Sequence, residues 1–242
     1  MTTNSAISVV IPAFNTSLYI GEAIQSALDQ TLAPTEVIIV DDGSTDDTAD
    51  VAAAFGDPVR IFRQPHRGIA ASRNFGVAQA RGALLAFLDS DDLWTPEKLE
   101  KQAEPLERDR ELHGVFGLVR QFYTPGLEVS EAQKQHLEAG IETGYHAGAL
   151  LIRRDAFDSV GQFDESFKLG EFIDWYARAR DIHLKLITLR EVLMLRRIHG
   201  ANTGILQLDK KSDYAKTIKG ILDRRKLAAS EARTIRSERT SS

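Results

Sequence analysis

The stretch that decides the fold is Leu84-Leu85-Ala86-Phe87-Leu88-Asp89-Ser90-Asp91-Asp92. Its apolar residues predict a buried β-strand, and acidic residues follow where that strand ends. If the strand persists, Asp89 and Asp91 point to the same side of it, because side chains alternate along a strand. Mn²⁺ and Mg²⁺ prefer oxygen ligands, often one or two carboxylates together with substrate phosphates. The stretch therefore predicts a metal site in which one carboxylate binds the cation and the other reaches a ribose hydroxyl.

A plainer interpretation of the same acidic residues is the start of a helix. Asp92 or Thr95 would cap that helix, and Pro96 suits its first position. Capping requires neither Asp89 nor Asp91, however, and clustered like charges cost stability when no cation is bound. We therefore favour the metal site.

Three earlier apolar runs also predict strands, and helical patterns separate them. The runs are Ile7 to Ile11, which Pro12 ends, then Glu36 to Val40, and Val59 to Phe62. This alternation predicts an α/β fold, a single Rossmann-like three-layer α/β/α domain with a mostly parallel central sheet. Ligands of such sheets bind at the carboxyl ends of the strands. Two of those ends carry paired aspartates, so we expect the site there.

The second acidic pair is Asp41-Asp42, followed by Gly43 and Ser44. A carboxylate at a strand end can accept hydrogen bonds from a nucleotide base or a ribose hydroxyl. The alternative is turn chemistry, because Asp-Gly is a strong turn signal. We also expect Ser44 or Thr45 to cap the next helix, with two further aspartates in its first turn.

A phosphate-binding glycine loop is missing after the first strand. The sequence there is Ile11-Pro12-Ala13-Phe14-Asn15, which excludes the dinucleotide and P-loop patterns and makes a dehydrogenase or a P-loop ATPase unlikely. A bound diphosphate would therefore need a metal ion to neutralise much of its charge. Arg73, on an early helical turn near the same edge, suits a diphosphate or a base, and equally a surface salt bridge.

The second half of the chain has a less regular pattern. Expected elements are a helix at 96–112, a strand at 115–123, a polar segment at 124–144, a strand at 147–152, a helix at 171–180 and one or two strands at 184–198. Glu171 and Asp174 are adjacent on one helical face, so either is a candidate general base, or both simply favour the helix dipole. His199 is a candidate metal ligand or a surface histidine, and His146 is a candidate for lining the acceptor site.

Composition restricts the class of protein. The chain has 242 residues, 43% hydrophobic and 27% charged, with no cysteine, which excludes disulfides and thiolate chemistry. A formal net charge of −5 argues against nucleic-acid binding. We expect no signal peptide, no membrane span and a cytoplasmic location. The segment 207–242 is basic, which predicts a solvated helix face or, alternatively, peripheral contact with the inner face of a membrane.

Together these motifs resemble family 2 glycosyltransferases of the GT-A fold. The resemblance rests on Val9 to Asn15, Val40 to Asp46, Ala71 to Asn74, Phe87 to Trp94 and, less strongly, Gly144 to Gly204. It implies an inverting transfer from a nucleotide-diphosphate sugar, with Mn²⁺ or Mg²⁺ as cofactor. The implied nucleotide-binding residues are Pro12, Ala13, Asn15, Asp41, Asp42, Arg73 and Asp89. The implied metal ligands are Asp91, Asp89 and His199, with Leu195 to His199 closing over the diphosphate.

The chain departs from this family at one position. Many relatives have Glu-Asp where this chain has Glu171-Phe172, and in them that aspartate is the usual base. Phe172 cannot accept a proton, so Glu171 or Asp174 would have to serve. The expected organisation is a nucleotide-sugar-binding half at 5–112, an acceptor-binding half at 113–206 and a basic tail at 207–242. The acceptor, a glycan, lipid-linked glycan or small molecule, stays open.

Two other functions fit the residues. A metal-dependent nucleotidyltransferase uses a related sheet but releases pyrophosphate, and the missing glycine- and lysine-rich loop disfavours it. A non-catalytic nucleotide-sugar binder or partner module would explain Phe172.

Overall fold

A nine-stranded sheet forms the centre of the molecule, with strand order β3-β2-β1-β4-β8-β6-β9-β5 and with β7 paired to β6. The computed structural model describes residues 6–124, 141–142, 145–199, 218–224 and 226. The expectations for the polar segment at 125–140 and 143–144, and for most of the basic tail at 207–242, lie outside these residues.

The first four strands are all parallel to one another. They are β1 (Ile7–Ala13), β2 (Glu36–Asp41), β3 (Val59–Arg63) and β4 (Leu84–Phe87). All residues of β1, β2 and β4 are buried, as expected for strands with both faces covered. Because the strands are parallel, their carboxyl ends, including the one before Asp89, lie at one edge of the sheet.

The remaining strands extend this sheet with mixed directions. They are β5 (Leu93–Trp94), β6 (Gly114–Tyr123), β7 (Ile141–Glu142), β8 (Leu150–Arg153) and β9 (Leu186–Ile198). Strand β8 is antiparallel to both β4 and β6, whereas β6 and β9 are parallel. The predicted α/β class with mostly parallel strands is confirmed, and the antiparallel pairs all involve the later strands.

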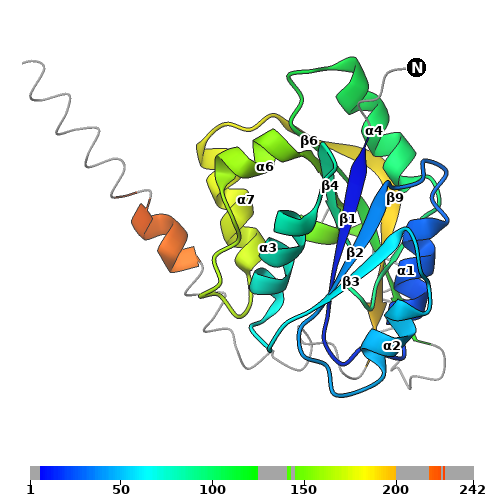
Figure 1. Ribbon diagram of the computed structural model, residues 1–242. Coiled ribbons are helices and arrows are strands. Elements are labelled where there is room, and N and C mark those ends of the chain that lie inside the picture. Colours follow the sequence, from blue (N-terminus) through cyan, green and yellow to red (C-terminus); the bar gives the residue numbers. More distant parts are fainter. Residues whose placement is uncertain (1–5, 125–140, 143–144, 200–217, 225, 227–242) are drawn as a thin grey trace, which may run out of the picture.

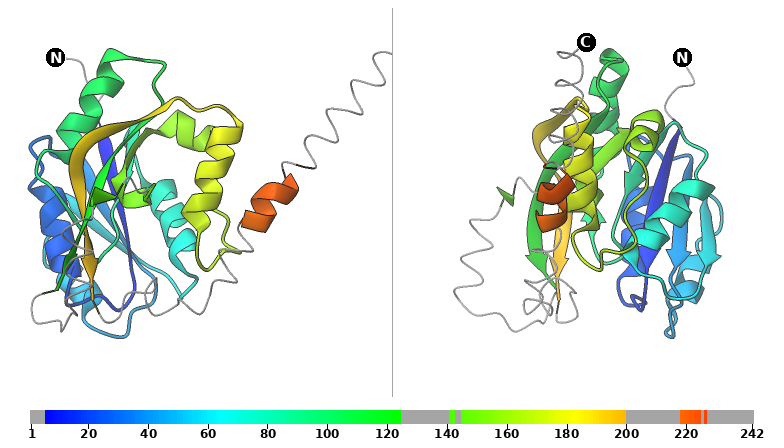
Figure 2. Two further views of the ribbon diagram at one scale, coloured as in Figure 1. Left: turned by 180° about the vertical axis from the view of Figure 1, so that it is seen from behind. Right: turned by 90° about the vertical axis from the view of Figure 1, so that its left-hand side faces the viewer.

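Helices cover both faces of the sheet (Figure 1). One face carries α1 (Ile20–Leu28) and α2 (Thr48–Ala53); the other carries α3 (Ile69–Gln79), α6 (Arg154–Val160) and α7 (Glu171–Asp181). Helix α4 (Lys98–Arg108) contacts β6 and β8. Residues 218–224 are also helical and lie beside α7 (Figure 2). The three-layer arrangement is therefore as predicted.

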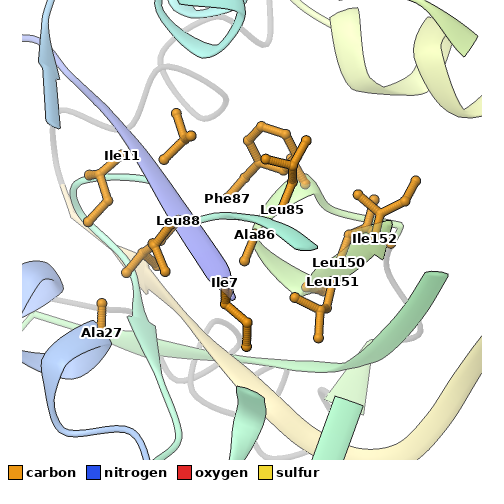
Figure 3. Packing of buried hydrophobic residues seen from close by; sticks show 14 of the residues in the cluster. Ile7, Ile11, Ala27, Leu85, Ala86, Phe87, Leu88, Leu150, Leu151 and Ile152 are labelled. Atoms are coloured by element: carbon orange, nitrogen blue, oxygen red, sulfur yellow. The ribbon is translucent and has the colours of Figure 1, made fainter. Parts of the chain in front are cut away.

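The core continues from the first half into the second through β4. Leu85, Ala86 and Phe87 lie between side chains of β1 and those of β8 (Figure 3). Helix α3 approaches the sheet closely at Gly76, where any added β-carbon would overlap the Val10 side chain. These contacts fix α3, and with it Arg73, against the carboxyl edge of the sheet.

Pro12 does not end the first strand, contrary to the prediction. It lies inside β1 and is in register with Val40 of β2. The last β1–β4 pair is Val10 with Phe87, and the carbonyl of Val10 accepts a hydrogen bond from Leu88. Residues two apart face the same neighbour, so Pro12 faces the side where β4 has already ended. Its missing N–H therefore costs no ladder hydrogen bond.

Two helices begin later than predicted. Neither Ser44 nor Thr45 caps α2, which starts at Thr48 because the Asp46 carboxylate binds the Thr48 amide (3.1 Å) and hydroxyl (2.5 Å) in a local turn. Helix α4 starts at Lys98, so neither Asp92 nor Thr95 caps it by a side-chain hydrogen bond. The strand expected from Ala147 begins only at Leu150, after a 3₁₀ turn, η1 (Ala147–Ala149).

Within the described residues, no helix is both long and apolar enough to cross a membrane. The division of the chain into segments 5–112, 113–206 and 207–242 stays a prediction.

Candidate active site at the carboxyl edge of the sheet

The acidic stretch after β4 is a turn rather than a continued strand. Strand β4 ends at Phe87, and the Asp92 amide donates to the Asp89 carbonyl at 3.1 Å. The strand does not persist to Asp91, so the side-chain alternation on which the expectation for Asp89 and Asp91 depended does not apply. The two carboxylates instead contact partners on different elements.

Asp89 belongs to a buried ion-pair cluster centred on Arg73. The guanidinium of Arg73 donates to Asp89 Oδ1 at 2.6 Å and to Glu171 Oε1 at 2.5 Å. Burial alone would lower the pKa of Arg73, but the charges of Asp89 and Glu171 offset this and raise its pKa above the ordinary value. Arg73 is 2% exposed, so its ion pairs are not surface salt bridges. It joins the acidic turn to the start of α7.

Asp91 contacts the end of β9. His199 Nε2 lies 3.0 Å from Asp91 Oδ2, and the histidine ring lies 4.4 Å from the ring of Tyr19. The Asp91 side chain keeps a quarter of its surface exposed, whereas that of His199 keeps 7%. The structure thus brings together two of the three residues predicted as metal ligands, although they are 108 positions apart.

Arg197, two residues earlier on β9, holds the acidic turn in place. Its amide donates to Asp92 Oδ1 at 2.8 Å, its Nε to the Asp91 carbonyl at 2.9 Å, and its Nη2 to Glu22 Oε2 at 2.6 Å. Sequence reasoning placed Arg197 only within a segment that closes over the ligand. Its anchoring role depends on the β5–β9 and β6–β9 pairings, which local sequence does not reveal.

Asp92 is the buried member of the acidic turn. Burial raises the pKa of its carboxyl well above the ordinary value, and the neighbouring Asp91 and Asp89 raise it further. Because it accepts the Arg197 amide, Asp92 joins the acidic turn to the end of β9.

The carboxyl ends of β1 and β2 form the adjoining part of the edge. Asp41 is fully buried; its Oδ1 accepts the Ser44 amide at 3.0 Å, and its Oδ2 lies 3.1 Å from Arg63 Nε. The Asn15 side chain accepts the Thr45 amide at 2.8 Å and thereby ties the two strand ends together. Pro12 and Ala13 are buried in β1 just before this junction.

Asp42 organises the loop that leads into α3. Its carboxylate accepts hydrogen bonds from Gln64, from the Arg67 amide at 3.0 Å and from the Gly68 amide at 2.8 Å. His66 Nδ1 also lies 2.8 Å from Asp42 Oδ2. Asp42 therefore has a structural role in the site: it fixes the loop before α3, which goes beyond a simple Asp-Gly turn.

Sequence reasoning missed an aromatic pair at this edge. Phe14 is 42% exposed and stacks on His66, with ring centroids 4.1 Å apart. Phe14 directly follows the buried strand β1. An aromatic residue at that position of the sequence was the signal that could have revealed the pair.

The two candidate bases of α7 lie in different environments. Glu171 is 7% exposed and faces Arg73. Asp174 is 1% exposed, and its two oxygens accept hydrogen bonds from Arg178 at 2.9 Å and from Arg224 of the helix at 218–224 at 2.6 Å. Phe172 packs among aromatic rings. Only Glu171, therefore, is joined to the acidic turn.

A metal ion would find two protein ligands here. Within the described part of the chain, no three His, Cys, Asp or Glu side chains are placed to hold a metal ion together. Asp91 and His199 supply one oxygen and one nitrogen, and Asp89 is already paired with Arg73. This fits a cation that takes its remaining ligands from a bound diphosphate and water.

The strand order, the mixed second half of the sheet and the acidic turn at its edge define a fold of the GT-A type. The structure of Staphylococcus aureus TarS in complex with UDP shares this fold, with a TM-score of 0.64 and 22% identity, over 79% of this chain and 60% of that one. The family model described as glycosyl transferase family 2 matches residues 8–161, and the chain belongs to this family.

Curated relatives agree with this assignment. An uncharacterized glycosyltransferase of Rickettsia typhi is 29% identical over 238 residues, which cover 89% of this chain and 71% of the relative. Chondroitin synthase of Escherichia coli is 31% identical over 232 residues, or 90% of this chain. This chain spans only 33% of the length of that synthase, and 60% of the TarS structure.

Proposed function

We propose that this protein transfers a sugar from a nucleoside-diphosphate sugar to an acceptor hydroxyl by a single, inverting displacement that a divalent cation assists. The observation that carries the proposal is the pairing of Asp91 with His199 at the carboxyl edge, beside Arg73 and the Asp41 junction. The UDP in the TarS complex supports a nucleotide as the donor's leaving group.

The nucleotide would lie over the ends of β1 and β2. Asp41 Oδ2 is buried and makes no hydrogen bond within the described structure, although Arg63 neutralises its charge. This oxygen can accept a hydrogen bond from a base N–H or a ribose hydroxyl. The exposed ring of Phe14 offers a stacking surface for the base, because aromatic faces pack well on flat rings.

Asp91 and His199 would hold Mn²⁺ or Mg²⁺, with Asp89 close by. Such a cation stabilises negative charge on a departing diphosphate. The protein's own contribution is to fix the ligands: Arg197 anchors the turn that carries Asp91, and Tyr19 packs against the ring of His199. Arg73 keeps Asp89 oriented toward the site.

Glu171 is the better candidate for the general base. It lies at the start of α7 and shares Arg73 with Asp89, which supports a role beside the acidic turn. Asp174 is held by two arginines and is buried, so its protonation would break two charged hydrogen bonds. The acceptor would approach from the side of α7.

The test is the substitution Asp91→Asn with Mn²⁺-dependent release of nucleoside diphosphate from a panel of UDP-, GDP- and dTDP-sugars. We expect a loss of at least ~100-fold in turnover, the scale seen when one electrostatic stabiliser is removed, with an unchanged melting temperature. Asp158→Asn, on the exposed face of α6, is the matched control and should retain full turnover. Unchanged turnover in Asp91→Asn would refute the metal role.

One observation favours a second candidate, a nucleotide-sugar binder without catalysis. Every carboxylate of α7's first turn is paired with arginine, and Phe172 stands where relatives carry a base. Calorimetry would then show metal-dependent binding of a nucleotide sugar, while product analysis shows no transfer to any acceptor or to water.

A further inference from the structure

A pair of stacked tyrosines lies on the acceptor side of the site. The rings of Tyr145 and Tyr176 are 4.3 Å apart with an interplanar angle of 20°. Phe116 of β6 meets the Tyr145 ring edge-on, at 5.2 Å and 79°. Tyr145 is nevertheless 50% exposed. Tyr176 covers one face of the Tyr145 ring, so within the described residues the exposed surface of Tyr145 lies on the remainder of the residue.

The position of this pair connects it to the reacting edge. Tyr145 comes just before η1, and a β-carbon on Gly148 of that turn would lie 3.7 Å from the Phe87 carbonyl. Phe87 ends β4, directly before the acidic turn. Because β8 is antiparallel to β4, the amino end of β8, which follows η1, lies at the carboxyl edge of β4.

Tyr176 approaches the same edge from α7. That helix begins at Glu171, and five residues correspond to about 7.5 Å along a helix axis. Phe172 stands one turn before Tyr176 on the same side of the helix, and both rings pack edge-on against Phe116, at 6.3 Å and 5.8 Å. The aromatic residue that replaces the family's usual base is therefore part of the support for the tyrosine pair.

The pair is held rigidly and has polar edges. Burial raises the pKa of the Tyr176 hydroxyl, as does its hydrogen bond with Tyr145, while Arg180 acts in the opposite direction. The hydroxyls of both tyrosines and the guanidinium of Arg180 therefore lie near each other. An apolar face bordered by hydrogen-bonding groups suits a ligand with the same two properties.

We propose that the Tyr145–Tyr176 pair is the acceptor subsite and that it receives a sugar ring, so that the acceptor is a carbohydrate. A pyranose has an apolar face of C–H groups and a rim of hydroxyls. The C–H face of the sugar would pack on the exposed part of the Tyr145 ring. The sugar hydroxyls would meet the hydroxyls of the two tyrosines and the guanidinium of Arg180. This inference rests on the proposed transferase function, and it assigns the acceptor class that the function leaves open.

The test compares Tyr145→Ala with the wild-type protein, using a defined panel of mono- and disaccharide acceptors and, in a separate arm, polyisoprenyl phosphate. We expect the acceptor KM of the best saccharide to rise roughly tenfold in Tyr145→Ala, the scale of one aromatic contact. The donor KM and the slow hydrolysis of the donor by water should stay unchanged. Tyr145→Trp should restore most of the acceptor affinity.

Ile187→Ala is the matched control, because Ile187 is an exposed apolar residue at the start of β9, away from the acidic turn. An unchanged saccharide KM in Tyr145→Ala would overturn the inference, and so would transfer to polyisoprenyl phosphate with none to any saccharide. In both cases donor hydrolysis by the wild-type protein would show that the transferase proposal stands. Absence of hydrolysis and transfer together would refute the transferase proposal itself.

Discussion

Lys98 is a buried amine whose replacement by methionine should change the pH dependence of stability. Its side chain is fully buried in α4, donates one hydrogen bond of 2.7 Å to Gln102 Oε1, and lies 4.0 Å from the centre of the Trp94 ring. Burial lowers the pKa of Lys98 well below its ordinary value of 10.5. The folded protein therefore holds Lys98 without a proton at pH values where the unfolded chain holds it with one.

The sign of the effect follows from this difference in bound protons. Between the lowered pKa of the folded state and about 10.4 in the unfolded state, unfolding takes up one proton at Lys98. The free energy of unfolding therefore rises with pH in this window, by about 1.4 kcal/mol per pH unit from this residue alone. This slope applies in full only above the lowered pKa, so from pH 8.0 to pH 9.5 the contribution is at most about 2 kcal/mol.

The assay is urea unfolding of the wild-type protein and of Lys98→Met at both pH values. Methionine leaves Gln102 Oε1 without its donor, which costs about 1–3 kcal/mol at either pH and cancels in the comparison. The stability of Lys98→Met relative to wild type should therefore fall, by at most about 2 kcal/mol, as the pH is raised from 8.0 to 9.5. Lys101→Met, a partly exposed position on the same helix, is the control and should show no such fall. A relative stability of Lys98→Met that does not change with pH would refute the reasoning.

Two further substitutions test the packing and the anchoring of the site. In thermal unfolding experiments, Gly76→Ala should lower the free energy of unfolding by about 1–3 kcal/mol, because the new methyl group overlaps Val10. The control is Gly21→Ala, whose methyl group makes only ordinary contact and which should be neutral or slightly stabilising. Arg197→Gln should raise the Mn²⁺ concentration for half-maximal turnover roughly tenfold, because it removes the guanidinium bond to the Asp91 carbonyl of the acidic turn. Glu22→Gln changes only an exposed partner of Arg197 and should shift that titration little, so equal shifts in both variants would contradict the anchoring role.

The strands of the first half could be predicted because their local sequence is apolar enough to indicate burial. Strands β1, β2 and β4 are continuous apolar runs whose residues are all buried. A parallel sheet covered on both faces requires such runs, so the pattern and the fold determine each other. The positions of α2 and α4 were less accurate, since a side chain such as Asp46 competes locally for the amides that begin a helix.

The arrangement of the second half could not be obtained in this way. Strand β8 is inserted between β4 and β6 and runs antiparallel to both. Nothing in a four-residue apolar run specifies its neighbours or its direction, because pairing depends on distant segments. The same limit applies to Arg197, whose importance follows from where β9 ends and not from the residues around it.

At the candidate site, residue types were predictable but their partners were not. The sequence marked Asp89, Asp91, Arg73, His199 and Glu171 as chemically suited to a nucleotide-sugar site, and the roles proposed for them stay predictions. It did not show that Arg73 would join Asp89 to Glu171, although Glu171 lies 98 positions after Arg73 in the sequence. An isolated arginine in a sequence fits a surface salt bridge equally well. Only the burial of Arg73 and its bonds to both carboxylates distinguish the two.

The aromatic surroundings of residue 172 give a physical reason for its departure from the family pattern. Phe172 is 6% exposed and lies 5.9 Å from Trp175, 6.3 Å from Phe116 and 6.5 Å from Phe163, measured between ring centroids. An ionised aspartate at this position would be surrounded by these rings, and burying an unpaired charge is strongly unfavourable. The phenylalanine therefore fits its neighbours, and the proposed base at this end of α7 would be Glu171. Since Arg73 neutralises Glu171, proton transfer to Glu171 requires Arg73 to shift its bonding toward Asp89 or the donor's diphosphate. Donor binding and activation of the acceptor would in that case be linked through a single arginine.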